Sequence, residues 1–382
     1  MSGRVIRFGL IGCGLMAREF ASACLRWPHL LDTGVRPVVV AVTDTKPSCH
    51  DWFAESLPTV RQFATDYREL LANPDVDAVY VAVPHNVHAT IYGDAIRAGK
   101  HLLGEKPWGI DLEANQEILR VLADHPGVFA RCSSQFPYFP AVMRIIRMIE
   151  AQRFGRIIEV DAGFWHSSDL DPNKPINWKR QVSMNGEYGC MGDLGMHVFH
   201  IPLRFGWMPR NVRGLLSKIV AERPGPDGKM VPCETWDNAV LACEAGQADE
   251  SFPMLLSMKR IAPGEANTWF LRIHGTELSA EFTTKYPKTL RTMPYRQGQP
   301  QSWEETDVGY VSAYPAITGP IFEFGFSDAI LQMVAAFCDE LTCRDQMQGP
   351  FACATPAETQ AHHRIMTAAL ESQRFGGTVA LR

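Results

Sequence analysis

The chain has 382 residues, of which 46% are hydrophobic and 21% charged, and its formal net charge is −5. These proportions are ordinary for a packed globular protein, and the negative charge argues against nucleic acid or an anionic membrane as partners. No uninterrupted apolar run reaches the ~18 residues that a bilayer crossing needs. The ten cysteines are scattered without a CxxC pair. This usage is typical of reduced thiols and predicts a cytoplasmic location.

The first predicted element is a strand that leads into a glycine-rich turn, with no signal-peptide pattern before it. Residues 5–17 read VIRFGLIGCGLMA and contain a GxGxxA fingerprint. In this pattern the first glycine permits a tight turn, the second lets the backbone approach a pyrophosphate, and the small last residue lets a helix pack on the strand. The predicted cofactor-binding residues of the turn are Gly12, Cys13, Gly14, Leu15, Met16 and Ala17.

The second strand, PVVVAVTDTK at residues 37–46, ends near Asp44. A carboxylate at this point can accept hydrogen bonds from ribose hydroxyls, which favours NAD over NADP. Lys46 keeps NADP possible, and Asp44 could alternatively be a simple turn residue. The spacing from the glycines exceeds the usual ~20 residues, and the stretch WPHLLDTGVRP accounts for the excess as a loop.

Two further strands, at residues 77–84 and 100–107, alternate with helical patterns. Such alternation predicts an α/β fold with a doubly wound parallel sheet, in which ligands bind beyond the carboxyl ends of the strands. Pro84 and Lys106 fall at such ends. Lys106 is either a solvated charge or an ammonium that stabilises a developing alkoxide. We assign residues 1–130 to this Rossmann domain.

Beyond residue 130 the alternation stops, and several consecutive strand patterns follow one long helical stretch. Consecutive strands separated by Gly- and Pro-rich breaks predict a large, mostly antiparallel open sheet. Helices would cover one of its faces, and two amphipathic helical patterns close the chain. Residues 131–382 are therefore expected to form an α+β domain, to which the resemblance described below assigns substrate binding and oligomerisation.

The stretch GEYGCMGDLGMH, residues 186–197, combines regularly spaced glycines with an acid and an imidazole at helical spacing. We interpret the glycines as clearance that lets the backbone pass close to a substrate. His197 is the best general base, because an ordinary imidazole titrates near neutrality. Asp193, one turn earlier, could fix a hydroxyl or support the imidazolium. A zinc site made of these two residues with Cys190 and His200 is disfavoured, because Asp193, His197 and His200 do not all share one helical face.

In this order, these motifs resemble the family of glucose–fructose oxidoreductase, inositol dehydrogenase and MocA. The resemblance rests on IGCGLMA, TDTKP, VAVPHNVHATIYGDAIRAGKHLLGEKPWGID, SSQFPYFPAVMRIIRMIE and the D-x-x-x-H of the glycine stretch, and covers residues 4 to about 222. One departure is Pro137, where many relatives place an arginine or another polar residue.

The resemblance implies roles for individual residues. Pro84, Asn86 and His88 would line the nicotinamide half, Glu105 and Lys106 would lie at the junction of cofactor and substrate, and Asp193 and His197 would complete the site. Lys106, Asp193 and His197 are the predicted catalytic residues. From the residue types we add His166, Trp178 and Arg180 as candidate substrate contacts, and we predict no metal.

The implied activity is hydride transfer between a nicotinamide cofactor, NAD or NADP, and a secondary hydroxyl or keto carbon of a sugar, polyol or glycoside. One alternative is transient sugar oxidation that drives NAD-dependent glycosidic bond cleavage. Another is a non-catalytic nucleotide-sensing regulator, against which Lys106, Asp193 and His197 argue together. The resemblance also implies homodimers or homotetramers formed through the open sheet.

Overall fold

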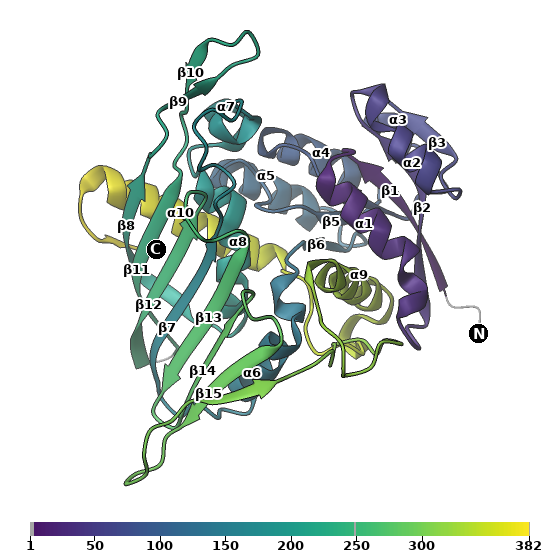
Figure 1. Cartoon of the computed structure of the whole chain (residues 1–382). Coiled ribbons are helices and arrows are strands. Elements are labelled where there is room, and N and C mark those ends of the chain that lie inside the picture. The colour runs from purple at the N-terminus through teal and green to yellow at the C-terminus, as the bar shows by residue number, and fades with distance from the viewer. Residues whose placement is uncertain (1–3, 248–249, 382) are drawn as a thin grey trace. The chain divides into compact units, whose positions relative to one another are not determined.

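The computed structural model describes residues 4–247 and 250–381, which form two compact units (Figure 1). The first unit contains Met1–Gly109, Glu113–Phe139 and Tyr310–Pro356, and the second contains Ile110–Leu112, Pro140–Gly309 and Ala357–Arg382. The division we expected at residue 130 differs from this in two ways. The first unit continues to Phe139, and it also takes up a segment from far along the chain.

The first unit is built on a six-stranded parallel sheet with the order β3-β2-β1-β4-β5-β6. This confirms the predicted doubly wound sheet. The strand order reverses between β1 and β4, which is the point where such sheets bind ligands beyond their carboxyl ends. The strands are β1 (Arg4–Ile11), β2 (Val35–Thr43), β3 (Gln62–Ala64), β4 (Ala78–Val81), β5 (His101–Gly104) and β6 (Ala130–Cys132).

Helices α1 and α9 pack against each other over this sheet. The aromatic ring of Phe8 on β1 lies 5.0 Å from that of Phe20 on α1 and 6.0 Å from that of Phe337 on α9. Helix α9, expected as an amphipathic helix of the second domain, therefore supplies core side chains to the first. The helices of this unit are α1 (Leu15–Leu25), α2 (Asp51–Ser56), α3 (Tyr67–Leu71), α4 (His88–Arg97), α5 (Leu112–Ala123) and α9 (Phe326–Cys343).

The second unit is built on a nine-stranded sheet with the order β16-β15-β14-β13-β7-β12-β11-β8-β17. Only the β7–β12 pair among these strands is parallel, which confirms a mostly antiparallel sheet. Its strands are β7 (Ile157–Trp165), β8 (Met208–Ser217), β11 (Asn238–Gln247), β12 (Glu250–Lys259), β13 (Thr268–Gly275), β14 (Leu278–Thr283), β15 (Thr289–Pro294), β16 (Glu304–Asp307) and β17 (Val379–Ala380). A separate hairpin consists of β9 (Glu222–Pro224) and β10 (Met230–Pro232).

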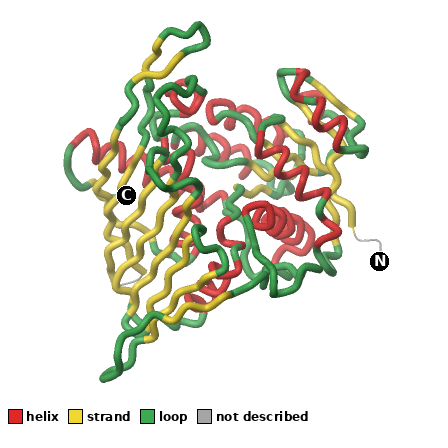
Figure 2. The backbone as a smooth tube through the Cα atoms, viewed as in Figure 1, coloured by secondary structure: helices red, strands yellow, loops and turns green. Residues whose placement is uncertain are grey.

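In Figure 2 the strands of the second sheet form one continuous layer. Helix α8 (Cys190–Arg204) contacts β7, β11 and β12. Helix α10 (Pro356–Phe375) approaches β8 so closely that a Cβ on Gly214 would lie 2.7 Å from the carbonyl oxygen of Ala369. Residues that point to the opposite face from the helices include exposed aliphatic side chains. The remaining helices of this unit are α6 (Pro140–Glu150) and α7 (Val182–Asn185).

Two further properties concern the helices and the cysteines of the described residues. None of the helices within residues 4–247 and 250–381 has the length and apolarity that a membrane crossing requires. The ten cysteines are free thiols, and seven of them are buried, with one exposed and two intermediate.

Candidate active site

The glycine turn lies between β1 and α1, and its shape requires its first glycine. Gly12 has φ +91°, and a Cβ there would collide with the carbonyl oxygen of Ala82. Gly14 precedes α1 as its N-cap, and a Cβ there would meet no atom within 4 Å. Open space beside Gly14 is what a ligand phosphate needs in order to approach the backbone at the start of a helix. Ala17 is fully buried against the sheet, which is the close packing predicted for this position.

Asp44 is tied directly to the glycine turn. Its Oδ2 accepts the Cys13 backbone N–H at 2.9 Å, and its Oδ1 accepts the Lys46 backbone N–H at 3.0 Å. A carboxylate offers about four acceptor positions, which leaves capacity for the two hydroxyls of a ribose. Burial, followed by the negative charge of Asp44, raises the pKa of the Cys13 thiol to about 12. Cys13 therefore stays a neutral thiol in this turn.

The turn after β5, which carries Lys106, is fixed by neutral donors around Glu105. The buried Glu105 carboxylate accepts the Tyr80 hydroxyl and the Ser133 hydroxyl, each at 2.6 Å. Its backbone carbonyl accepts the Tyr92 hydroxyl at 2.7 Å. Burial, together with the Glu105 charge, raises the pKa of Tyr80 well above its usual value. Glu105 thus faces the interior and anchors this turn, and the cofactor contact predicted for it remains a prediction.

Lys106 follows at this anchor, half-buried, and is joined to Pro107 by a cis peptide bond. Trp108, at φ +69°, is fully buried and donates its indole N–H to the carbonyl of Gly104 at 3.3 Å. The backbone on both sides of Lys106 is therefore held in place by buried groups.

At the end of β4, the three predicted cofactor contacts differ in accessibility. Pro84 is half-buried and Asn86 is exposed, whereas His88 is fully buried. The Nε2 of His88 lies 3.1 Å from the Val83 carbonyl, and its Nδ1 accepts the Gly109 N–H at 3.4 Å. The ring of His88 therefore holds backbone in the interior, and its contact with the cofactor remains a prediction.

The predicted acid–imidazole pair lies on consecutive turns of α8, and both side chains are buried. Asp193 is 2% exposed and His197 6%. The His197 ring packs edge-on against Phe164 at 5.4 Å, and its backbone carbonyl accepts the indole N–H of Trp269 at 2.8 Å. Helix α8 starts after Gly189, which has φ +56°.

The glycines around this pair provide clearance for the protein itself, which corrects our interpretation of them as clearance for a substrate. A Cβ on Gly195 would lie 2.5 Å from Nε2 of His362 on α10. A Cβ on Gly189 would lie 2.6 Å from the backbone nitrogen of Trp236. The spacing therefore reflects close packing of α8 against its neighbours.

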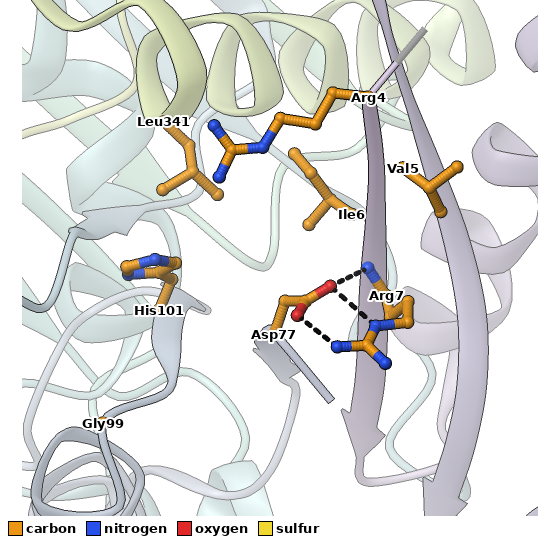
Figure 3. Close-up of a pocket in the computed structure, with 8 residues that line it drawn as sticks. All are labelled: Arg4, Val5, Ile6, Arg7, Asp77, Gly99, His101 and Leu341. Atoms are coloured by element: carbon orange, nitrogen blue, oxygen red, sulfur yellow. Dashed lines mark hydrogen bonds and ion pairs between the residues drawn. The ribbon is translucent and has the colours of Figure 1, made fainter. Parts of the chain in front are cut away.

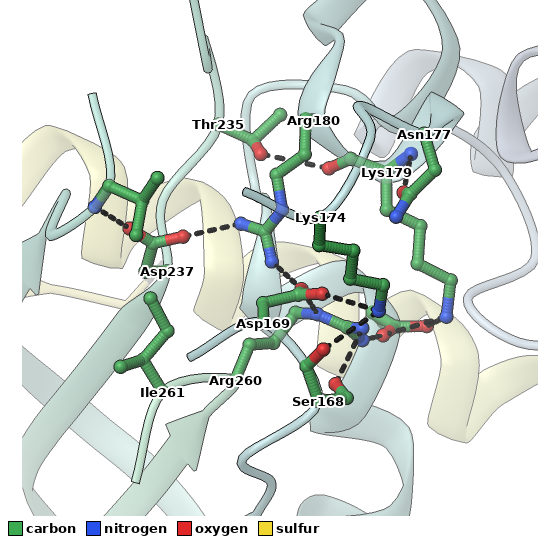
Figure 4. A network of polar contacts seen from close by, with 12 residues as sticks. Ser168, Asp169, Lys174, Asn177, Lys179, Arg180, Thr235, Asp237, Arg260 and Ile261 are labelled. Atoms are coloured by element: carbon green, nitrogen blue, oxygen red, sulfur yellow. Dashed lines mark hydrogen bonds and ion pairs between the residues drawn. The ribbon is translucent and has the colours of Figure 1, made fainter. Parts of the chain in front are cut away.

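Asp193 is ion-paired from two directions, by Lys179 and by Arg260, both of which are labelled in Figure 4. Lys179 Nζ lies 2.8 and 3.0 Å from its two oxygens, and Arg260 donates to Oδ2. Lys179 lies in the loop before α8, between the candidate contacts Trp178 and Arg180. Arg260 was missed, since nothing at the end of β12 indicates that its partners lie 67 and 91 residues earlier.

The three candidate substrate contacts from the loop before α8 differ from one another. Arg180 is fully buried and bonds Asp169 and Asp237, and its contact with substrate remains a prediction. Trp178 is half-buried, with Lys179 Nζ 5.6 Å from its ring. His166 is also half-buried, and burial, followed by the charge of Arg260, lowers its pKa to about 4. Trp178 and His166 remain predictions.

A pocket of about 400 Å³ lies elsewhere in the first unit (Figure 3). It opens at the amino ends of β1, β4 and β5, where the Asp77 carboxylate accepts the Arg7 backbone N–H at 2.8 Å and the Arg7 guanidinium at 2.7 Å. None of the predicted site residues lines it. Within the described ranges, no group of three or more His, Cys, Asp or Glu side chains could hold a metal.

Known proteins share both the sequence pattern and the fold. Residues 6–131 match the oxidoreductase family with an NAD-binding Rossmann fold. The chain is 25% identical over 296 residues to levoglucosan dehydrogenase of Pseudarthrobacter phenanthrenivorans, which covers 72% of this chain and 73% of that protein. It is 33% identical over 191 residues to 1,5-anhydro-D-fructose reductase of Ensifer adhaerens, covering 50% and 54% respectively.

Solved structures extend the likeness to the whole fold. The apo form of levoglucosan dehydrogenase has a TM-score of 0.89 with this chain at 22% identity, and the match covers 99% of each chain. An inositol dehydrogenase homolog from Azotobacter vinelandii, complexed with NAD⁺, has a TM-score of 0.78 at 20% identity and covers 99% of this chain and 97% of that one.

The fold and the glycine turn thus define an NAD-binding oxidoreductase of the Rossmann class. The match of residues 6–131 confirms the resemblance to the family of glucose–fructose oxidoreductase, inositol dehydrogenase and MocA.

Proposed function

We propose that the protein is an NAD-dependent dehydrogenase or reductase acting on a secondary hydroxyl or keto carbon of a sugar or polyol. The observation that carries this proposal is the buried pair on α8, an ion-paired carboxylate followed one turn later by an imidazole. The relatives named above are a levoglucosan dehydrogenase and an anhydrofructose reductase, and their names support a carbohydrate as substrate.

The residues of this chain would divide the chemistry of alcohol oxidation. The bound nicotinamide supplies the acceptor for the hydride that leaves the carbinol carbon. His197 accepts the hydroxyl proton as the carbonyl forms, and in the reductive direction it returns that proton. Lys106 donates a hydrogen bond to the reacting oxygen and stabilises its developing negative charge. Asp193 accepts a hydrogen bond from a substrate hydroxyl and so fixes the orientation of the sugar.

The first unit supports NAD as the cofactor. The space beside Gly14 suits a pyrophosphate, and the Asp44 carboxylate suits the hydroxyls of an unphosphorylated ribose. A second negative charge, on a ribose phosphate, would be repelled by Asp44. Of the turn residues, Cys13, Leu15 and Met16 would contribute backbone rather than side-chain chemistry.

A screen of sugars and polyols with NAD and NADP, followed by the absorbance of the reduced cofactor, tests the proposal. We expect turnover with NAD, and we expect Lys106→Met and His197→Ala each to lower kcat by at least about 100-fold. Lys229→Met, at a side chain that is 84% exposed, is the matched control and should match wild type.

Three results would assign a different function. Turnover of both variants within about tenfold of wild type would remove the assigned roles. Cleavage of a glycoside without net NADH would indicate redox-assisted bond cleavage. Tight NADH binding with no turnover of any sugar or polyol would indicate a nucleotide-sensing regulator.

We also propose that the protein forms a homodimer or homotetramer through the outer face of the large sheet. Leu215, Val240 and Leu255 are 56%, 38% and 38% exposed, and Val240 pairs directly with Leu215 across the β8–β11 ladder. Neighbouring aliphatic side chains on one face form an apolar patch of the kind that marks an interface. Light scattering on Val240→Lys against wild type tests this. The free thiols support a reducing compartment, and we propose the cytoplasm.

A further inference from the structure

Six charged side chains of the second unit form a chain of contacts in which positive and negative groups alternate (Figure 4). At one end of this series, Lys179 Nζ lies 2.8 Å from Asp193 Oδ1. At the other end, a guanidinium nitrogen of Arg180 lies 2.5 Å from Asp237 Oδ1. Apart from Lys179, whose side chain is 28% exposed, every member is at most 9% exposed. In order, the members are Lys179, Asp193, Arg260, Asp169, Arg180 and Asp237.

Arg260 lies at the centre of this chain and uses all three guanidinium nitrogens. Its Nε donates to Asp169 Oδ2 at 2.6 Å, one terminal nitrogen donates to Asp193, and the other donates to Ser168 Oγ at 3.1 Å. A guanidinium is planar and rigid. The positions of the Asp169 and Asp193 carboxylates are therefore coupled through one flat group.

Asp169, the carboxylate that anchors Arg260, is itself fixed. Burial alone would raise the pKa of Asp169, but the charges and hydrogen bonds of Arg260 and Arg180 lower it below its ordinary value. The backbone carbonyl of Asp169 accepts the Arg223 guanidinium at 2.5 Å. Asp169 is thus a permanent buried anion that orients Arg260, and removing it would leave two buried cations short of a partner.

The near side of Arg260 determines what Asp193 can do. Asp193 is 2% exposed and accepts from both Lys179 and Arg260. Two adjacent cations favour the ionised carboxylate, which accepts hydrogen bonds and donates none. Rotation of the carboxylate would break its contact with Arg260. An ionised carboxylate in one orientation can select a substrate hydroxyl by position.

We propose that Arg260 is a positioning residue of the oxidoreductase reaction, which holds Asp193 ionised and in one orientation through a guanidinium that is anchored on Asp169. This inference rests on the proposed function. Arg260 itself does not touch substrate or cofactor. Its effect on catalysis is transmitted by the Asp193 carboxylate.

The test compares Arg260→Lys, Arg260→Ala and Asp169→Asn with wild type, using a sugar or polyol that the wild type turns over. A lysine keeps the charge but cannot bridge two carboxylates. We expect kcat/KM to fall about 100-fold in both Arg260 variants, since small displacements of positioning groups cost about this much. Asp169→Asn, which keeps the shape but loses the charge behind Arg260, should lower kcat/KM about tenfold. NADH affinity, measured by fluorescence, should stay within about twofold of wild type in each variant.

Chemical rescue separates positioning from a general effect on folding. Guanidinium chloride at non-denaturing, millimolar concentration should raise kcat of Arg260→Ala about tenfold or more, and it should not raise kcat of Lys106→Met. Lys229→Ala is the control, because Lys229 forms a surface ion pair with Asp227 at 3.5 Å in the second unit, away from the large sheet. It should retain wild-type kcat/KM.

The outcomes distinguish this role from the proposed function. A wild type that turns over no sugar or polyol would remove both. An active wild type with Arg260→Lys and Arg260→Ala within about threefold of its kcat/KM would overturn the positioning role alone. A loss in Arg260→Ala that guanidinium does not reverse, with Asp169→Asn unchanged, would also overturn it. If Arg260→Ala does not fold, Arg260→Lys and Asp169→Asn decide between the same alternatives.

Discussion

The turn that carries Lys106 and the helix that carries Asp193 are fixed by different kinds of contact. Around Lys106, neutral hydroxyls of Tyr80, Ser133 and Tyr92 converge on Glu105. Around Asp193, the contacts are ion pairs between buried charges. A set of neutral donors places backbone, whereas a chain of ions places one charged side chain. We conclude that the turn with Lys106 is specified by shape and the surroundings of Asp193 by charge.

The largest expected effect in the first unit comes from filling the space at Gly12. Gly12→Val places a Cβ against the Ala82 carbonyl at φ +91°. Left-handed backbone and overpacking together should cost about 2–5 kcal/mol of the free energy of unfolding. Denaturant unfolding measures this loss, and NADH binding should disappear with it. Gly14→Ala is the contrasting variant, because open space surrounds that position. It should fold normally and bind NADH more weakly, and normal binding by both variants would contradict the assigned cofactor site.

The second unit should be the more sensitive to acid. Burial lowers the pKa of His200 to about 3; the charge of Glu358 opposes this shift, and that of Arg204 adds to it. An unfolded histidine binds its proton near pH 6.5, so the stabilisation is complete above that pH and is lost as the pH falls toward 3. Between pH 7 and pH 5 this one residue should remove about 2 kcal/mol from the free energy of unfolding.

His200→Gln checks that expectation, since glutamine keeps an acceptor near Arg204, whose guanidinium lies 3.2 Å from His200 Nε2. The loss of unfolding free energy between pH 7 and pH 5, measured with urea, should shrink by about 2 kcal/mol. His125→Gln, at a partly buried position after α5, serves as the control. Equal losses in wild type and His200→Gln would contradict the account.

The smallest expected effect comes from removing the charge of Glu105, whose partners are neutral hydroxyls. Glu105→Gln keeps an oxygen that can accept both the Tyr80 and Ser133 hydroxyls, so unfolding free energy should change by less than about 1 kcal/mol. Glu105→Ala leaves both hydroxyls without this acceptor and should cost about 2–5 kcal/mol. Thermal melting of the two variants tests the contrast. Equal destabilisation by Gln and Ala would mean that the charge of Glu105, and not its shape, holds the turn.

The sequence allows prediction of the parts of this molecule whose determinants are local. The turn of Gly12 and Gly14 and the parallel sheet follow from short patterns and their order, and both are confirmed. The spacing of Asp193 and His197 also predicted one helix, which α8 confirms.

Sequence reasoning failed where contacts join distant segments. Asp193 contacts Arg260 across 67 residues, and no local pattern distinguishes Arg260 from a solvated arginine at a strand end. The sequence around Arg180 likewise does not reveal its partners. A charged loop residue carries no local sign that two buried aspartates neutralise it. The packing of His362 against Gly195 similarly depends on α10, which lies far along the chain.

The return of residues 310–356 to the first unit has a consequence for recombination between relatives. A gene fragment that ends at Phe139 would lack α9, and with it the Phe337 ring that packs against Phe8. Neither unit is encoded by one continuous stretch. An exchange of nucleotide-binding modules among relatives therefore requires three coordinated crossovers, after Phe139, before Tyr310 and after Pro356. Single-crossover chimaeras would separate core side chains that have adapted to each other.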